Sequence, residues 1–257
     1  MNTKQHKMKN FLIVILVTLI NTNLFGQVYK LEYKFGDNMP MVGYSSYNAI
    51  LEYNTKTKES VYTVLKKGIK TENSTDDNMI MLGDDIIDDI VIYNNFKDSL
   101  TLTQDQIDIE MMIFKEKTPK IKWLLTDETK IKNNLNLKKA TSNFRGRNYE
   151  VWYTLDIPVS IGPWKLNGLP GAIVEAKENI NRYSWELVKF SKLKEDEFKK
   201  FYKNPKYKEY DIKFYPKYKF STPERIKEKL RKIDSNFQFP EPERDDIELK
   251  FEWENNL

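Results

Sequence analysis

The sequence contains no cysteine and only one histidine, His6, among its 257 residues. The lack of cysteine excludes disulfides, thiolate metal sites, thiol nucleophiles and a lipid-modified N-terminal cysteine. His6 lies in an N-terminal segment that we expect to be removed, so the rest of the chain has no imidazole. Catalysis by Ser-His-Asp or Cys-His groups and metal binding through imidazole are therefore excluded for that part. An enzyme mechanism would have to use carboxylates, lysine, tyrosine or an oxygen-bound metal.

Long apolar runs are also scarce. Residues 11–20 form an apolar run of ten residues behind Lys4, Lys7 and Lys9, about half of the roughly 20 residues that span a bilayer. A basic start followed by a short apolar run is typical of a secretory signal peptide. We predict cleavage near Gly26, no transmembrane segment after cleavage, and a periplasmic or secreted protein comprising a single β-rich domain over residues 27–257.

The charges are nearly balanced. The chain has 42 Lys and Arg against 38 Asp and Glu, and three of the lysines lie in the predicted signal peptide. Residues 199–219 mix lysines with aromatic residues, a combination that can bind polyanions through charge and stacking. An exposed amphipathic segment has the same composition, so we predict neither a nucleic-acid partner nor a cofactor.

Alternating apolar and polar residues predict a mainly β protein. Residues 29–35 alternate in the period-two pattern of a strand with one buried face. Similar runs occur at residues 44–53, 60–66, 86–94, 106–114, 120–126, 149–155 and 183–187. Because the breaks are short, we expect an antiparallel meander of roughly ten strands, strongly curved and open like a half-barrel.

Helical signals are confined to the end of the chain. Residues 193–203 can place apolar side chains on one helical face, and a clearer helix is predicted where Thr222 can act as the cap before Pro223. Residues 247–253 alternate again and predict a last strand. We therefore expect one or two C-terminal helices packed against the sheet.

Prolines and glycines are concentrated between Ile157 and Glu178, in the sequence IPVSIGPWKLNGLPGAIVEAKE. Pro170 and Gly171 suit the second and third positions of a type II turn, the third requiring a positive φ. Gly168 permits close backbone approach. Such a rigid loop either closes the sheet over a buried tryptophan or presents a binding surface. The candidate ligand- or partner-binding residues are Trp164, Gly168, Leu169, Pro170 and Gly171.

Two arginines form a second candidate site. Arg145 and Arg147 flank Gly146 and place two guanidinium groups on a short turn, which can bind a carboxylate or phosphate. The alternative is pairing with carboxylates of neighbouring strands. The suggested partners are Glu150, Asp156, Glu175 and Glu178.

These motifs resemble the GLPGLI family of exported envelope proteins. The resemblance is carried by residues 144–147, 152–154, 157–158, 162–163 and 168–173, and it is most specific between residues 119 and 190. Ala172 stands where the family has its second leucine, and Leu137 where a cysteine is often found. The resemblance implies an exported, β-rich protein of Gram-negative envelopes and transfers no catalytic residue.

An acidic run invites a metal hypothesis. Asp84, Asp85, Asp88 and Asp89 surround two isoleucines, but their spacing does not match a calcium-binding loop. We interpret the run as a solvated turn and predict no metal site.

Three functions are consistent with these patterns. The first is a noncatalytic binding or accessory protein of the Gram-negative envelope with an envelope protein as partner. The second is a periplasmic carrier of an apolar or lipid ligand, which requires an open concave face. The third is a carboxylate-dependent hydrolase, in which two of Asp156, Glu175, Glu178 and Glu186 would converge in a cleft. We predict no catalytic residue, and enzymatic activity is not favoured.

Overall fold

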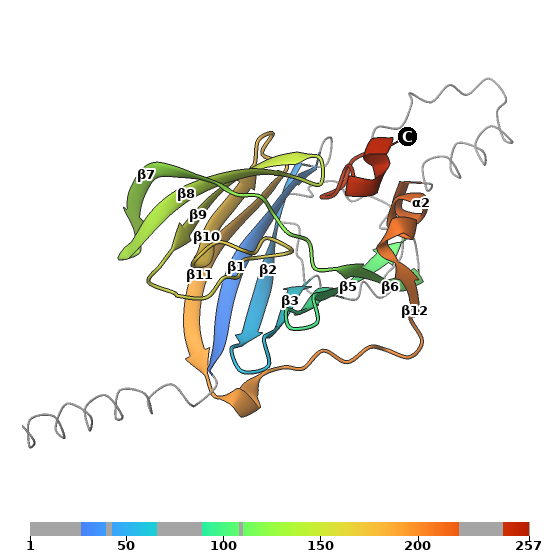
Figure 1. Ribbon diagram of the computed structural model, residues 1–257, viewed down its shortest axis with the longest axis horizontal. Helices are drawn as coiled ribbons and strands as arrows, with labels where there is room; N and C mark the ends of the chain where they lie inside the picture. Colours follow the sequence, from blue (N-terminus) through green and yellow to red (C-terminus); the bar gives the residue numbers. More distant parts are fainter. Residues whose placement is uncertain (1–26, 40–42, 66–88, 108–109, 221–243, 257) are drawn as a thin grey trace, which may run out of the picture.

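The chain forms one large, strongly curved sheet. A computed structural model describes residues 27–39, 43–65, 89–107, 110–220 and 244–256 (Figure 1). Its twelve strands follow the order β12-β6-β5-β4-β3-β2-β1-β11-β10-β9-β8-β7. All neighbours pair antiparallel except β12, which pairs parallel with β6. The prediction of a mainly β, curved and open antiparallel sheet is confirmed.

The strands are β1 (Val28–Met39), β2 (Gly43–Asn54), β3 (Glu59–Leu65), β4 (Ile90–Asn95), β5 (Leu100–Ile107), β6 (Glu110–Lys117), β7 (Leu124–Lys132), β8 (Leu135–Phe144), β9 (Arg147–Thr154), β10 (Ala172–Glu178), β11 (Tyr183–Leu193) and β12 (Lys208–Asp211). The central strand β1 pairs with both β2 and β11, and most of its residues alternate between buried and more exposed positions. Among the described residues, α2 (Tyr215–Phe220) is the single α-helix, and none of their helices has the length and apolar character that crossing a bilayer requires.

Two predicted elements near the end of the chain are wrong. Residues 193–203 contain only the short 3-10 turn Glu195–Glu197, because this part of the chain must reach from β11 to β12 at the far edge of the sheet (Figure 1). An extended residue advances about 3.3 Å, whereas a helical residue advances about 1.5 Å. Residues 247–253 form no strand. The helix predicted from Thr222 lies outside the described residues.

The concave face of the sheet is filled by residues 155–171, which we call the inner loop. Its Trp164 lies 6.2 Å from the ring of Trp185 and 5.6 Å from that of Phe144. Tyr33 of the central strand donates a hydrogen bond to the carbonyl of Ile173, 2.7 Å away, just beyond the loop. Each fully buried large apolar side chain contributes roughly 1.5–3 kcal/mol, so the inner loop is part of the core.

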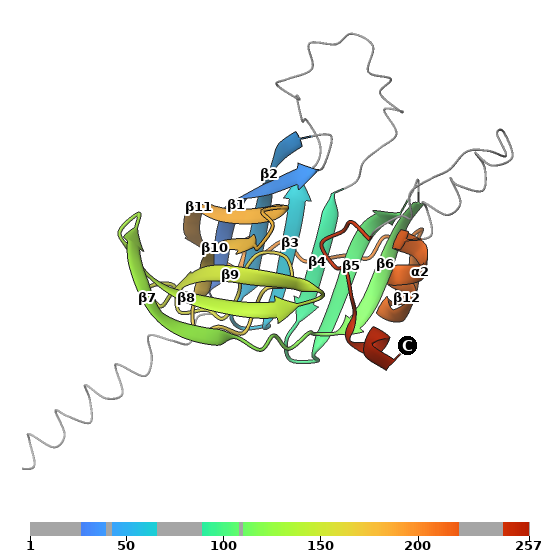
Figure 2. The same ribbon diagram turned by 90° about the horizontal axis from the view of Figure 1, so that it is seen from above.

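Two segments connect the ends of the sheet. Residues 118–123, the crossing segment, run from β6 to β7, the edge strand opposite β12. Residues 244–256, the C-terminal segment, lie between the β8–β9 turn and the strands β5 and β6 (Figure 2). The backbone N–H of Leu249 donates to the carbonyl of Arg145 at 2.8 Å. The crossing segment thus links the two halves of the open sheet covalently, and the C-terminal segment links them through noncovalent contacts.

Candidate functional site

Arg145 lies in the turn between β8 and β9 and points into the protein. Its side chain is 2% exposed, and its backbone adopts a φ of 53°. The guanidinium donates to Glu116 at 2.6 Å, to Glu248 at 2.9 Å and to Glu252 at 3.0 Å. The planar fork of five donors suits an arginine for several carboxylates at once. Arg145 is thus committed to internal partners.

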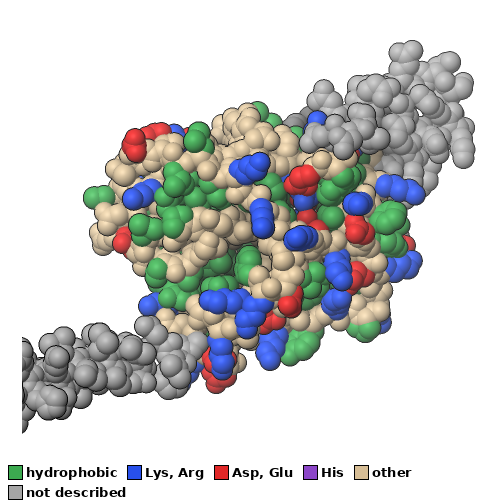
Figure 3. All heavy atoms as spheres, in the orientation of Figure 1, with side chains coloured by type: hydrophobic (Ala, Val, Ile, Leu, Met, Phe, Trp, Pro, Cys, Tyr) green, Lys and Arg blue, Asp and Glu red, His purple; other side chains and the backbone are tan. Residues whose placement is uncertain are grey.

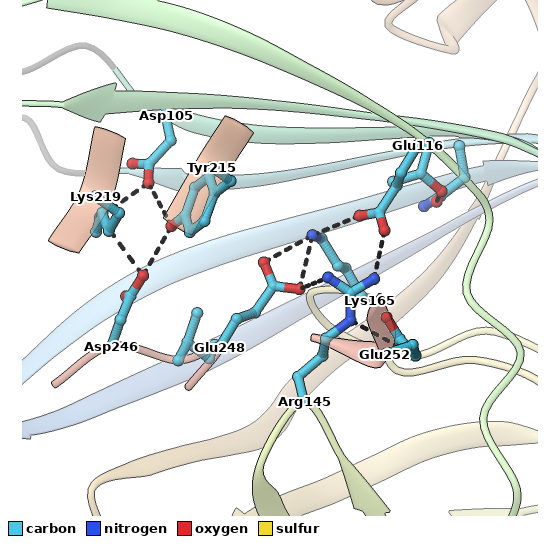
Figure 4. Close-up of polar contacts among 12 residues, drawn as sticks. Asp105, Glu116, Arg145, Lys165, Tyr215, Lys219, Asp246, Glu248 and Glu252 are labelled. Atoms are coloured by element: carbon cyan, nitrogen blue, oxygen red, sulfur yellow. Dashed lines mark hydrogen bonds and ion pairs between the residues drawn. The ribbon is translucent and has the colours of Figure 1, made fainter. Parts of the chain in front are cut away.

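Lys165, at the centre of the inner loop, completes this cluster. Its side chain is fully buried, and its ammonium contacts Glu116 at 2.7 Å and Glu248 at 2.9 Å. Glu116, Arg145, Lys165 and Glu248, which we call the ionic seam, come from β6, the β8–β9 turn, the inner loop and the C-terminal segment (Figure 4). Two positive and two negative buried groups balance, which is the condition under which burial of charge is tolerated.

The two carboxyl groups of the ionic seam are not equivalent. Burial acts to raise the pKa of Glu116, but the charges of Lys165 and Arg145 outweigh it and hold that pKa below its usual value. For Glu248 burial wins, and the pKa is raised. Opposite shifts in neighbouring carboxyl groups also occur in acid–base sites. Here both side chains are at most 4% exposed and both contact Lys165 and Arg145, so the arrangement supports the fold.

Arg147, at the start of β9, holds the C-terminal segment by binding a backbone carbonyl of that segment. Its guanidinium donates twice to the carbonyl of Asp246, at 2.6 and 3.0 Å, and lies 3.5 Å from Glu178. Glu178 itself accepts from the backbone N–H groups of Ile180 and Tyr183. Of the four carboxylates suggested for the two arginines, only Glu178 pairs with one of them; Glu150, Asp156 and Glu175 contact other residues.

Further polar contacts to the same segment were not predicted from the sequence. Arg182 pairs with Asp245 at 3.2 Å and also with Asp37, and the guanidinium groups of Arg147 and Arg182 lie 4.9 and 4.8 Å from the ring of Tyr183. The sequence did contain one signal for these contacts, because a run of acidic residues needs cationic partners if it is buried. That run is Asp245, Asp246, Glu248 and Glu252.

A third cluster fixes helix α2. The hydroxyl of Tyr215 contacts Asp105 at 3.1 Å and Asp246 at 2.8 Å, and the ammonium of Lys219 contacts Asp105 at 3.0 Å (Figure 4). Burial raises the pKa of Tyr215 well above its usual value, and both aspartates add to the shift. Tyr215 is therefore a neutral hydrogen-bond donor. No signal in the sequence pairs residue 105 with residue 246.

Gly168 and Gly171 of the inner loop have the reverse of their predicted roles. Gly168 has a positive φ of +94°, whereas Gly171 has none. A Cβ atom on Gly171 would lie 1.9 Å from the carbonyl oxygen of Thr154, so that position requires glycine for close backbone contact. The type II turn predicted with Gly171 at its third position is wrong because strand β10 begins at Ala172, directly against β9.

The other candidate residues of the inner loop differ in exposure. Trp164 and Leu169 are buried in the core, whereas Gly168 and Pro170 are exposed. Gly168 also lines a surface hollow, with Trp123 as its neighbour. The structure therefore brings Gly168 to the surface hollows described next and leaves Trp164 and Leu169 inside, while the buried Arg145 lies beneath the wall of one hollow.

Three hollows follow one another along the crossing segment. Their volumes are about 680, 280 and 350 Å³. Lys122 and Asn143 line both the first and the second hollow, and Lys120 and Ile121 line both the second and the third. We call this row of hollows the groove. In Figure 3, Lys and Arg side chains gather over the middle of the face where Figure 1 shows the crossing segment.

The carboxylates proposed for hydrolysis are paired with lysines or backbone groups. Glu175 and Glu186 are cross-strand neighbours, and Lys132 bridges them at 2.6 Å to each. Burial acts to raise the pKa of Glu175, but hydrogen bonds from Lys130 and Lys132 lower it overall. The backbone N–H of Asn136 lowers the pKa of Asp156. A lowered pKa does not suit a general acid.

No group of three or more carboxylate or imidazole side chains within the described ranges is arranged to hold a metal. Of the acidic run considered in the sequence, residues 84–88 lie outside those ranges.

Comparisons with known proteins give a family and a fold. A family model described as "Protein of unknown function (Porph_ging)" matches residues 37–175, just over half of the chain. A search of curated proteins gave no match. Among solved structures, "Structure of PNGF-II in C2 space group" is similar, with a TM-score of 0.50 and 19% identity, and "Structure of PNGF-II in P21 space group" has a TM-score of 0.49 and 18% identity.

Both alignments cover 76% of this chain and 33% of the other. The chain thus spans about a third of the length of the solved structures it matches. At this identity the likeness concerns the fold alone.

Proposed function

The chain belongs to the Porph_ging family of proteins of unknown function, and we propose that it is an exported, noncatalytic binding domain of the Gram-negative cell envelope. On this proposal residues 1–26 are a signal peptide removed near Gly26, and residues 27–257 form the mature domain. The order of lysines and apolar residues at the N-terminus and the resemblance to the GLPGLI family support export to the periplasm or beyond.

The groove is the observation that carries the binding role. Polar side chains inside the protein are mostly paired, as the ionic seam illustrates. Along the groove, by contrast, the side chains of Lys120, Lys122, Asn179 and Asn181 have no hydrogen-bond or ion-pair partner in the described part of the chain. Polar groups that line adjoining hollows are available to orient a ligand. We infer that the groove contacts the ligand.

The candidate residues named from the sequence take two roles in this proposal. Gly168 lines the groove and is proposed to contact the ligand or partner. The others are proposed to fix the shape of its walls: Arg145, Arg147, Trp164, Leu169, Pro170 and Gly171. Arg147 acts by holding the C-terminal segment.

The two alternative functions have less support. A carrier needs an open concave face, whereas the inner loop packs Trp164 against Trp185 and Phe144 on that face. A hydrolase needs two carboxyl groups free to exchange protons, whereas Glu175 and Glu186 share Lys132. These contacts favour a binding role.

Native mass spectrometry of the mature protein, purified gently from its own envelope fraction, tests the proposal. We expect an added mass, either a small ligand or a protein partner. Replacing Asn179 with tryptophan fills the first hollow, so Asn179→Trp should lose that mass. The matched control Lys200→Trp places the same side chain at an exposed position outside the groove and should keep it.

Two results would contradict the binding role assigned to the groove. One is a bare mass for the gently purified wild type. The other is an added mass that survives equally in Asn179→Trp and Lys200→Trp, which would place the ligand on another surface.

A further inference from the structure

Resting on the proposed function, we propose that the groove binds an acidic polysaccharide, with Lys120, Lys122 and Lys250 receiving its carboxylate or phosphate groups. All three lysines line the second hollow and are exposed. They come from two segments far apart in the sequence, the crossing segment and the C-terminal segment. Their convergence on one hollow of about 280 Å³ gives the groove an anion subsite.

The acidic residues of the groove do not cancel these charges, because each already has cationic partners. Glu252 contacts Arg145 at 3.0 Å. Glu150 contacts Lys139 at 3.2 Å and Lys177 at 3.5 Å. No ion pair within the described residues involves any of the three lysines of the subsite. The second hollow therefore has three lysines, Lys120, Lys122 and Lys250, against one lining carboxylate, that of Glu252, and carries an excess of positive charge.

Glu178 is the remaining acidic residue of the first hollow, and it is fully buried. Arg147 and the backbone N–H groups of Ile180 and Tyr183 satisfy it. It therefore does not repel an anion in the groove.

The neighbouring first hollow suits the neutral part of a sugar chain. Asn179 and Asn181 present amides that can donate to and accept from hydroxyl groups, and they lie beside Lys122, which both hollows share. The three successive hollows suit an extended chain more than a compact ligand.

The test uses the full mature chain and two soluble polymers, polygalacturonate as the carboxylated probe and dextran as the neutral one. Isothermal titration at low salt should show binding of polygalacturonate and much weaker binding of dextran. Added salt shortens the Debye length from about 10 Å at 0.1 M to about 3 Å at 1 M, so the affinity for polygalacturonate should fall steeply. Lys120→Gln, Lys122→Gln and Lys250→Gln combined should weaken binding by about tenfold or more.

A matched control removes three positive charges elsewhere. Lys34, Lys200 and Lys213 are exposed and do not line the groove, so their combined change to glutamine should alter the affinity less than about twofold. Equal losses in the two triple variants would overturn the anion subsite, as would full affinity in the groove variant.

The outcomes also separate this inference from the proposed function. Equal affinity for dextran and polygalacturonate, sensitive to Asn179→Trp, would overturn the acidic ligand and leave the groove as a binding site. Binding of neither polymer, together with a mass adduct on the native protein, would overturn the polysaccharide assignment alone. A polymer carrying phosphate groups in place of carboxylates distinguishes the two anionic groups.

Discussion

Trp164 and Lys165 are adjacent in the sequence and both buried, yet they lie in opposite environments. Trp164 is 6% exposed and packs among aromatic rings, whereas Lys165 is 1% exposed and contacts carboxylates. The positive φ of Trp164, 55°, lets consecutive side chains diverge. One residue belongs to the apolar core and the next to the ionic seam.

The difference teaches how the open sheet is completed. The apolar core needs only bulk and shape, so it tolerates related residues of similar volume. The ionic seam needs each charge to keep its partner, because leaving a buried charge uncompensated costs about 3–5 kcal/mol. The inner loop therefore stabilises the fold by two mechanisms that respond differently to pH.

The largest effects should come from Trp164→Ala and Lys165→Met. Each should lower the free energy of unfolding by about 3–5 kcal/mol, the first through a cavity and the second through unpaired carboxylates. Without the ammonium, the folded-state pKa of Glu116 should rise above the unfolded value, and that of Glu248, which is already raised, should rise further. The cost of Lys165→Met is then full at neutral pH and shrinks as pH falls through that raised pKa. Urea unfolding at several pH values measures both.

A second change identifies the origin of the Lys165 effect. Adding Glu248→Leu to Lys165→Met removes one unpaired charge and leaves Glu116 paired with Arg145, so part of the stability should return. For Trp164→Ala the cost should stay constant with pH. A cost of Lys165→Met that is equally constant would show that Lys165 acts through packing alone.

Two of the glycines in the inner loop, Gly168 and Gly171, give the next effect. Gly171→Ala should cost about 1–3 kcal/mol or more, because its Cβ would meet a backbone oxygen at 1.9 Å. Gly168→Ala should cost about 1–2 kcal/mol from its left-handed backbone alone, since the nearest atom is 3.8 Å away. Gly168→Asn should cost less than Gly168→Ala, because asparagine tolerates positive φ. Thermal unfolding ranks them, and a smaller effect at Gly171 than at Gly168 would contradict the close contact with Thr154.

The smallest effect is expected on the outer face of the sheet. Glu175→Gln removes contacts to Lys130 and Lys132 and should cost about 0.2–1 kcal/mol at neutral pH. Because the folded-state pKa of Glu175 is lowered, this contribution is present above the unfolded pKa of about 4.3 and is lost as pH falls through the folded value. Glu186→Gln, at a more exposed site, should cost less. An unfolding curve for Glu175→Gln that differs from wild type equally at all pH values would rule out the ion pairs as the cause.

The sheet could be predicted because its signal is local. Alternation in residues 29–35 and 149–155 reports one buried face for each strand, and short breaks report antiparallel neighbours. The position of β12 was not predictable in this way, because its four residues pair parallel with β6, almost a hundred positions earlier. The extended path of residues 193–203 also depends on where β12 lies, which local propensity does not record.

The candidate site was predictable only in part. Arg145 and Arg147 were predicted because two arginines on a short turn form a pattern that is visible in the sequence. Their carboxylate partners are up to 107 residues away, and no spacing rule connects the arginines to those partners. The groove was missed because its lysines come from separate segments. The roles of Gly168 and Gly171 were interchanged because the sequence shows that a position requires glycine. It does not show whether the reason is a positive φ or a close backbone contact.

The ionic seam also sets the order in which the molecule can be completed. Glu248 follows Arg145 by 103 positions and Lys165 by 83, and contacts of such separation form late and slowly. During synthesis from the N-terminus, Arg145 and Lys165 emerge long before Glu248 and find only Glu116. The half-made chain therefore carries two cations for one carboxylate, and its last step in time is the arrival of the acidic segment that neutralises them.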